Sequence, residues 1–266
     1  MKIFVCVKQV PDTRGRVYLK KDGSLNRAKM TTIINPDDLS AVENALAVKA
    51  KTGAEVIAVT MGPLTSKIMM HELYAMGVDE TVIVSARELV GSDTYGTSQV
   101  LAAAIAELGF GSDDIIICGQ QAIDGDTAQV GPEIAEKLDI AQATNVSGME
   151  YADGAVVCVR DFENCSVKVR ICTPCLVCCK KESASPRYMD IGRIIDWDES
   201  RLRVINYDEL KSFPLFDEEV VGGTGAPTIV LTTFALPKKS SGVMLGGSSR
   251  EAAEQLVSIM GEKHLI

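Results

Sequence analysis

Short apolar runs of strand length alternate with helical patterns along the first half of the chain, and this alternation limits the folds that the chain can adopt. The apolar runs cover Ile3–Val7, Val56–Thr60, Thr81–Ser85 and Asp114–Cys118. Between them apolar residues recur at helical spacing, and each helical segment ends at a glycine, namely Gly53, Gly77 and Gly109. Continuous apolar runs are typical of strands buried on both faces of a parallel sheet, which needs helical crossovers. The pattern therefore predicts an α/β fold with a doubly wound, Rossmann-like parallel sheet.

The second half of the chain has a different pattern. A fourth helix is expected to begin near Ala128, because Pro132 lacks a backbone N–H and suits the first turn of a helix. Short strands are then predicted at 146–151, 155–160, 166–171 and 175–179, and Asp153-Gly154 marks a hairpin turn in this antiparallel portion. Beyond Trp197, segments rich in glycine and proline precede a last helix at about 249–260. We expect residues 1–195 to form the α/β domain and residues 196–266 to form a C-terminal arm, folded on its own domain or laid on a partner.

Charge and hydropathy exclude several classes of partner. The chain has 27 Lys and Arg against 36 Asp and Glu, a formal net charge of −9, so no nucleic acid is expected as a partner. No apolar stretch reaches the ~18 residues of a membrane span, so no membrane insertion is expected. The apolar run at the N-terminus is shorter than the ~7 to 15 residues of a secretory signal, which predicts a cytoplasmic protein.

Two residue types bear on catalysis and metal binding. The only histidines are His71 and His264, which leaves almost no material for Ser/His/Asp or Cys/His catalysis, so no catalytic residue is expected. Four of the eight cysteines form the run Cys172-x-x-Cys175-x-x-Cys178-Cys179. The flanking residues suggest an extended strand, in which residues three apart point to opposite faces and cannot close on one metal cluster. These cysteines are therefore interpreted as small buried hydrophobes, and no metal site is predicted.

Two loops that lead from predicted strands into helices are candidates for nucleotide binding. In open α/β sheets ligands bind beyond the carboxyl ends of the strands, although neither the P-loop nor the G-x-G-x-x-G motif is present. Gly119–Gln129 combines glycines, amides and hydroxyls with a helix N-terminus, and can hold an adenosine and its phosphate. Asp124 and Asp126 would repel a bare phosphate, so we assign them to ribose hydroxyls or to helix capping. Ser92–Ser98 is a second such helix N-terminus, although Asp93, Thr94 or Ser98 alone could be a simple helix cap.

Several motifs, in this order and spacing, resemble the beta subunit of electron-transfer flavoproteins. They are Lys8-Gln-Val-Pro-Asp-Thr13, Asn35-Pro-Asp-Asp38, Val59-Thr-Met-Gly-Pro63, Gly119-Gln-Gln-Ala-Ile-Asp-Gly-Asp126 and Pro186-Arg-Tyr188. The resemblance covers essentially the whole chain. It implies an adenine-nucleotide-binding α/β domain whose arm, residues 196–266, packs on an alpha subunit that holds the electron-delivering FAD. The segment Arg160–Cys165 departs from the family's glycine-rich acidic turn, which puts the geometry of that hairpin in doubt.

The resemblance also implies a cofactor and its binding residues. Ser92–Ser98 is similar to the electron-bifurcating type, which holds a second FAD in this subunit and uses NADH as electron donor, whereas the housekeeping type holds AMP there. We therefore expect FAD, with AMP as the alternative. The residues expected to bind the cofactor are Cys6, Val7, Lys8, Asn35, Asp37, Met61, Asp93, Thr94, Thr97, Ser98, Gly119, Gln121, Ala122, Ile123, Asp124, Gly125, Thr127 and Gln129.

The resemblance finally implies partners. The expected function is that of an electron-transfer subunit in an NADH-dependent flavin oxidoreductase complex. Electrons pass to ferredoxin or flavodoxin and, through the alpha subunit, to a flavin-dependent dehydrogenase of the acyl-CoA or 2-hydroxy-acid type. Pro186, Arg187, Tyr188 and Met189 resemble the loop that recognises this dehydrogenase. The alternatives are a housekeeping carrier with structural AMP and a stand-alone ATP-binding or ATP-cleaving α/β protein.

Overall fold

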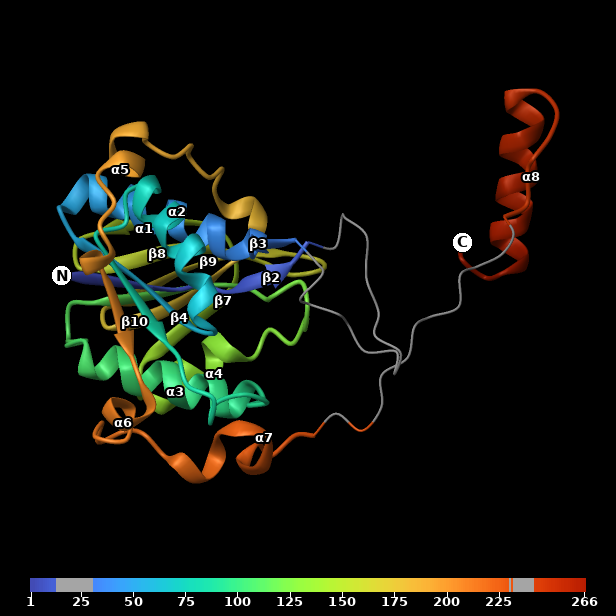
Figure 1. Cartoon of the computed structure of the whole chain (residues 1–266). Coiled ribbons are helices and arrows are strands. Elements are labelled where there is room, and N and C mark those ends of the chain that lie inside the picture. Colours follow the sequence, from blue (N-terminus) through green and yellow to red (C-terminus); the bar gives the residue numbers. More distant parts are fainter. Residues whose placement is uncertain (13–30, 230, 232–241) are drawn as a thin grey trace.

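A single large sheet forms the frame of the protein. The computed structural model describes residues 1–12, 31–229, 231 and 242–266, and the arrangement of its elements is drawn in Figure 1. Within these residues nine strands pair in the order β11-β5-β4-β1-β6-β10-β7-β8-β9, and β2 and β3 form a separate two-stranded ribbon. The strands are β1 (Lys2–Cys6), β2 (Gln9–Pro11), β3 (Thr32–Ile34), β4 (Glu55–Met61), β5 (Glu80–Val84), β6 (Ile115–Gly119), β7 (Ala141–Ala152), β8 (Ala155–Asp161), β9 (Ser166–Cys172), β10 (Cys175–Cys179) and β11 (Leu202–Ile205).

Helices cover both faces of the parallel part of the sheet. On one face α1 (Pro36–Thr52) and α2 (Lys67–Met76) pack on alternate residues of the strands, including Ile3 and Val5 of β1. On the other face α3 (Thr94–Glu107) and α4 (Val130–Lys137) pack on the intervening residues, including Phe4 and Cys6. Strands buried on both sides need apolar residues at every position, which explains the uninterrupted runs in the sequence. The predicted doubly wound α/β fold is confirmed.

The order of the strands creates a switch point between β1 and β6. From β1 the chain proceeds outward to β4 and β5 on one side, and it then returns across the opposite face through α3 to β6 on the other side of β1. Cys6 of β1 lies opposite Cys118 of β6 in the parallel register. The segments that leave these two strands separate toward different faces, which opens a crevice at the carboxyl ends of the strands.

The region after α4 differs in part from the prediction. The helix begins at Val130 rather than near Ala128, because Ala128 has a left-handed φ of 54° that no α-helix accommodates. β7, β8 and β9 form the predicted antiparallel meander, and Asp153 and Gly154 both have positive φ at its first turn, as two-residue hairpins require. β10 instead inserts between β6 and β7 and runs parallel to both.

The cysteine-rich run is divided by this arrangement. Cys175, Cys178 and Cys179 are buried on β10, and burial raises the pKa of the Cys178 thiol to about 12. Cys172 is exposed, contrary to the expectation, because it ends β9, the edge strand of the sheet. Among the described residues no group of His, Cys, Asp or Glu side chains is arranged to hold a metal ion.

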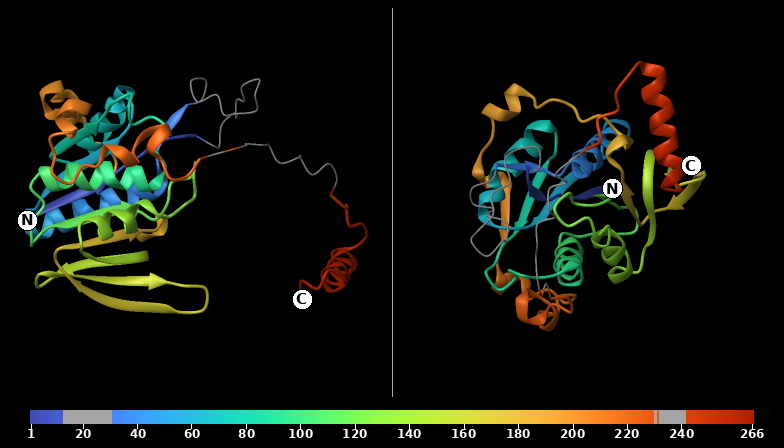
Figure 2. Two further views of the ribbon diagram at one scale, coloured as in Figure 1. Left: turned by 90° about the horizontal axis from the view of Figure 1, so that it is seen from below. Right: turned by 90° about the vertical axis from the view of Figure 1, so that its right-hand side faces the viewer.

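The C-terminal residues begin within the main sheet. Residues 202–205, which the predicted division assigns to the arm, form β11 and pair in parallel with β5. The short helices α5 (Ile191–Ile195), α6 (Tyr207–Leu210) and α7 (Gly222–Gly225) lie before and after β11 in the sequence. The last helix, α8 (Ser249–Glu262), starts with a capping box at Ser248, has no buried residue and is drawn apart from the sheet in Figure 1 and in the left-hand view of Figure 2. None of the described helices is long and apolar enough to cross a membrane.

A test of the close packing of α4 on β10 uses Gly131, in the first turn of α4. A Cβ at this position would collide with Sγ of Cys178. Alanine favours helix by up to ~1 kcal/mol over glycine, whereas overpacking a core costs about 1–3 kcal/mol. We expect Gly131→Ala to lower the free energy of unfolding by about 1–2 kcal/mol in urea denaturation.

Gly261→Ala is the matched control, because Gly261 is also helical and has open space where a Cβ would stand. Adding Cys178→Ala to Gly131→Ala should recover part of the loss. Strictly additive effects of the two substitutions would show that the collision is not the cause.

Candidate functional site

The predicted nucleotide loops meet at the carboxyl edge of the sheet. β1, β4 and β6 end there at Cys6, Met61 and Gly119, and the right-hand view of Figure 2 looks onto this edge. Cys6 and Val7 are buried, and Met61 is partly buried. Thr13, which ends the first of the family-like motifs, lies outside the described residues.

Asn35 joins the loop after β6 to the start of α1. Its Nδ2 donates to the carbonyl of Gln121 at 2.8 Å and to Oδ1 of Asp38 at 3.0 Å, while its Oδ1 accepts from the N–H of Ile123 at 3.2 Å. The residue stands at the N-cap of α1, but its side chain makes no capping hydrogen bond. A fully buried amide needs all of these partners, so it fixes the loop against the start of α1.

Asp38 is a buried carboxylate that sequence reasoning did not select as a site residue. Its Oδ2 accepts from the backbone N–H of Lys8 at 2.7 Å. Burial is the main cause that raises its pKa to about 7, against the opposing hydrogen bonds from Asn35 and Lys8. Gly119 packs directly on it, because a Cβ there would collide with the Asp38 carboxylate. The sequence gives one signal for this residue, the Asp37-Asp38 pair, but both carboxylates suit the first turn of a helix and the pair alone does not show which one is buried.

The remaining loop residues bring charges together across the crevice. Nζ of Lys8 forms an ion pair at 2.8 Å with Asp124, whose side chain is only 6% exposed. Asp37 accepts from the N–H of Gln121 at 3.3 Å, and burial is the largest cause of its raised pKa. Asp126 has a left-handed φ of 50°, a conformation that is uncommon outside glycine and typical of functional loops. Ala122 and Ile123 are half-buried, and Gly125 and Thr127 are exposed.

The second predicted helix N-terminus is largely satisfied by its own residues. Asp93 accepts from the N–H of Gly96 at 3.0 Å and from that of Thr228 at 2.8 Å. Desolvation opposes its ionisation, but these hydrogen bonds prevail and lower its pKa. Ser98 is fully buried, and its hydroxyl donates to the carbonyl of Tyr95 at 2.8 Å. Asp93 is therefore a helix cap here, while Thr94 and Thr97 keep partly exposed surface.

The two helix N-termini lie side by side. Oγ1 of Thr94, at the start of α3, is 3.2 Å from Oε1 of Gln129 and 3.1 Å from Oε1 of Glu133, both at the start of α4. One turn further along, Nζ of Lys137 lies 3.5 Å from the centroid of the Tyr95 ring. The positive ends of two helix dipoles therefore lie together beside the crevice.

This edge of the sheet presents polar groups that can bind a ligand. It offers amides, hydroxyls and helix N-termini, and Asp38, whose pKa lies near 7, is enclosed by its own hydrogen bonds. A nucleotide with two phosphates fits this set of groups, because paired helix N-termini suit anions and the Asn35 cluster offers polar atoms for a nucleoside.

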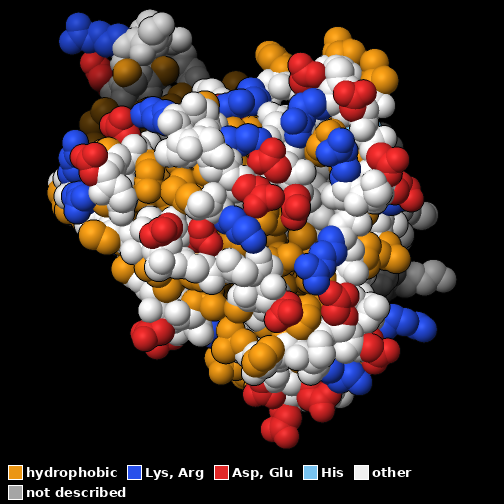
Figure 3. Space-filling model, turned by 90° about the vertical axis from the view of Figure 1, so that its left-hand side faces the viewer, with side chains coloured by type: hydrophobic (Ala, Val, Ile, Leu, Met, Phe, Trp, Pro, Cys, Tyr) orange, Lys and Arg blue, Asp and Glu red, His pale blue; other side chains and the backbone are white. Residues whose placement is uncertain are grey.

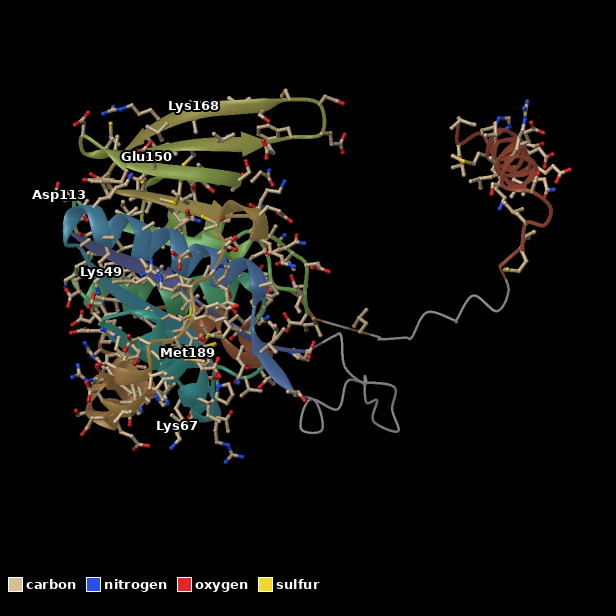
Figure 4. The ribbon with its side chains drawn as sticks, turned by 90° about the horizontal axis from the view of Figure 1, so that it is seen from above. Lys49, Lys67, Asp113, Glu150, Lys168 and Met189 are labelled. Atoms are coloured by element: carbon tan, nitrogen blue, oxygen red, sulfur yellow. The ribbon has the colours of Figure 1, made fainter. Side chains whose placement is uncertain are left out.

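The predicted partner-binding loop lies over α1 and α2. Arg187 forms a two-pronged ion pair with Glu43 of α1, with both N–O distances 2.8 Å, so its guanidinium is held against the body of the protein. Tyr188 is 98% exposed and Met189 is 46% exposed, whereas Pro186 lines a cavity of about 680 Å³ beneath the loop. In Figure 4 Met189 lies between Lys49 of α1 and Lys67 of α2. Acidic and basic side chains are interspersed on the face that Figure 3 shows.

Comparison with known proteins gives consistent relatives. Residues 22–200 match the model of the electron transfer flavoprotein domain. An acryloyl-CoA reductase electron transfer subunit gamma from Anaerotignum propionicum is 48% identical, with 100% of both chains covered. The caffeyl-CoA reductase-Etf complex subunit CarD from Acetobacterium woodii is 40% identical, again over 100% of both chains. An electron transfer flavoprotein subunit beta from Thermoanaerobacterium thermosaccharolyticum is 36% identical with the same coverage.

The raised pKa of Asp38 predicts how the free energy of unfolding depends on pH. The unfolded chain releases this proton near the ordinary pKa of 3.8 and the folded chain near 7, so between these values the folded chain holds the extra proton. Stability therefore falls as pH rises through this window, by at most ~1.4 kcal/mol per pH unit. In urea denaturation at pH 5, 6, 7 and 8, Asp38→Asn should lack this component of the slope. Asp113→Asn, at an exposed aspartate, should keep it. If the free energies of unfolding of Asp38→Asn and wild type change in parallel with pH, the raised pKa of Asp38 is refuted.

Proposed function

The chain belongs to the beta subunits of the electron transfer flavoprotein family, and from this premise we propose that it binds FAD in an NADH-dependent, electron-bifurcating complex. The chemistry that bound FAD would supply is to accept a hydride from NADH and to pass the two electrons of that hydride to different acceptors. The residues of this chain would bind the cofactor, orient it and exclude water. The proposed partners are an alpha subunit that carries its own FAD, a flavin-dependent dehydrogenase, and ferredoxin or flavodoxin.

The observation that carries the proposal is the contact between the N-termini of α3 and α4 through Thr94. A single phosphate needs only one helix N-terminus, whereas a dinucleotide presents two linked phosphates and a further sugar-like chain. In this arrangement the Asn35 cluster, with Asp37 and the loop at 121–124, would hold the adenosine. The N–H groups that begin α3 and α4 would hold the diphosphate, and Thr97 would lie toward the ribityl chain.

One observation favours the housekeeping alternative, in which AMP takes the place of FAD. The carboxylate of Asp93 already accepts the N–H of Gly96, which reduces the donors that α3 can offer to a second phosphate. Membership of the family argues against the stand-alone ATP-cleaving alternative. The choice between FAD and AMP therefore depends on how many flavins the complex holds.

The names of the relatives support a dehydrogenase of the acyl-CoA type. Two of them are subunits of reductases that are named for acryloyl-CoA and caffeyl-CoA. We propose that Pro186–Met189 forms part of the surface that docks this enzyme. Tyr188 and Met189 are exposed, Ile191 and Ile195 continue the apolar patch, and contiguous exposed apolar residues are typical of interfaces. The ion pair of Arg187 with Glu43 would hold the loop in place rather than meet the partner directly.

Flavin stoichiometry tests the proposed cofactor. We expect the purified complex with the alpha subunit to release two FAD per heterodimer on denaturation, and its visible absorption to bleach when NADH is added. Thr97→Val, which keeps the shape of the side chain and removes the hydroxyl, should lower the FAD content toward one. One FAD and one AMP per heterodimer in the wild type, with no response to NADH, would establish the housekeeping alternative.

A second experiment tests the docking loop. Tyr188→Ala and the double variant Arg187→Ala/Tyr188→Ala should weaken binding to an acyl-CoA dehydrogenase from the same organism by about tenfold or more, because exposed aromatic residues are frequent hot spots. Flavin content should not change, and Lys168→Ala, at an exposed residue of β9, should bind as the wild type does. Loss of flavin from the Tyr188→Ala variant would contradict a role in docking.

A further inference from the structure

Glu133 contains a buried oxygen that the described residues leave without a partner. The residue lies in the first turn of α4, where its Oε1 accepts from the hydroxyl of Thr94 at 3.1 Å. Its Oε2 is buried, and among the described residues no donor forms a hydrogen bond with it. A buried acceptor without a donor is rare in folded proteins and opposes folding, so it points to a group that arrives from outside the chain.

The number of donors and acceptors around Thr94 leads to the same conclusion. Oε1 of Gln129 and Oε1 of Glu133 compete for the one hydrogen of the Thr94 hydroxyl, and Oε2 of Glu133 has no donor among the described residues. The cluster therefore has more acceptors than donors. A ligand that completes it must donate hydrogen bonds.

The charge of Glu133 decides which part of a ligand can do so. A carboxylate repels phosphate oxygens, which offer no hydrogen, and it attracts hydroxyl groups. Thr94 and Gln129 begin the two helices whose N–H groups would hold the diphosphate, so the groups that lie within reach are those on the chain next to it. The Asn35 cluster already offers polar partners for the ribose at the adenosine end of the nucleotide.

We infer that Glu133 is a further cofactor-binding residue, which accepts a hydrogen bond from a hydroxyl of the ribityl chain of bound FAD. This inference rests on the proposed function, because AMP has no ribityl chain and ADP has none either. Glu133 would thereby favour a flavin dinucleotide over an adenine mononucleotide at the same site. The unpaired oxygen would destabilise the free chain, and the hydrogen bond from bound FAD would remove this destabilisation.

Titration of the full chain by calorimetry with FAD, ADP and AMP tests the inference. Glu133→Ala should bind FAD about tenfold or more weakly, since a hydrogen bond to a charged group is lost. The same variant should bind ADP and AMP as tightly as the wild type or more tightly, because a negative charge near the phosphates is removed. Glu133→Gln keeps an acceptor oxygen and should recover most of the FAD affinity.

Two further measurements separate this role from a structural one. The melting temperature of Glu133→Ala without nucleotide should equal or exceed that of the wild type, because an unpaired buried oxygen is removed. Glu136 is an exposed glutamate three residues after Glu133 in α4. Glu136→Ala should leave the affinities for FAD, ADP and AMP unchanged.

The outcomes distinguish this inference from the proposed function. Equal loss of FAD and ADP affinity in Glu133→Ala, or a lowered melting temperature, would show a structural role and overturn the inference. Unchanged FAD affinity in Glu133→Ala would overturn it as well. A wild-type chain that binds AMP but not FAD would contradict the proposed function itself, and the inference with it.

Discussion

The hydrogen bonds of the buried Asn35 side chain are the interaction on which the site depends. The side chain of Asn35 connects the start of α1 to the loop after β6, and the backbone N–H of Asn35 donates to the carbonyl of Lys8, which follows β1. These segments are far apart in the sequence and adjacent at the switch point. A buried amide is costly unless its donors and acceptor are satisfied, and a single arrangement of the loop satisfies them all. Gly119 makes this arrangement possible, because any larger residue would displace the Asp38 carboxylate beside it. The nucleotide loop is thus held in shape by residues that face inward, which leaves its outer groups available to a ligand.

The parallel sheet explains why these loops meet. Its buried strands could be predicted from the sequence alone, whereas other parts of the fold could not. Uninterrupted apolar runs at 3–7 and 114–118 predicted strands buried on both faces, and this part of the fold follows from hydropathy. The position of β10 could not be predicted in this way, since a run such as Cys175–Cys179 is equally suited to the centre of a sheet and to a hairpin. The predicted start of α4 was also wrong. The loop imposes a left-handed conformation on Ala128, and an alanine gives no sequence signal for that conformation.

For the site residues, too, the sequence predicts one property and not another: it predicts where they lie but not what each carboxylate does. Polar residues that follow strands were identifiable from the sequence, since the carboxyl ends of parallel strands meet at one edge. What each carboxylate does was not identifiable, because it depends on burial and on partners distant in the sequence. Asp93 binds its own helix and the segment at Thr228, and Asp124 pairs with Lys8. The Asp37-Asp38 pair does not show which carboxylate is buried, and no sequence motif marks Glu133. The same limit applies to Arg187, whose partner Glu43 is 144 residues away.

We propose that the N-termini of α3 and α4 together bind the diphosphate of one dinucleotide. Hydrogen–deuterium exchange of backbone amides, measured on the complex with the alpha subunit with and without added FAD, tests it most directly. We expect FAD to slow exchange both at 94–98 and at 120–131, and AMP to slow exchange only in the second segment. Slowed exchange in one segment alone on addition of FAD, or equal patterns for FAD and AMP, would contradict it.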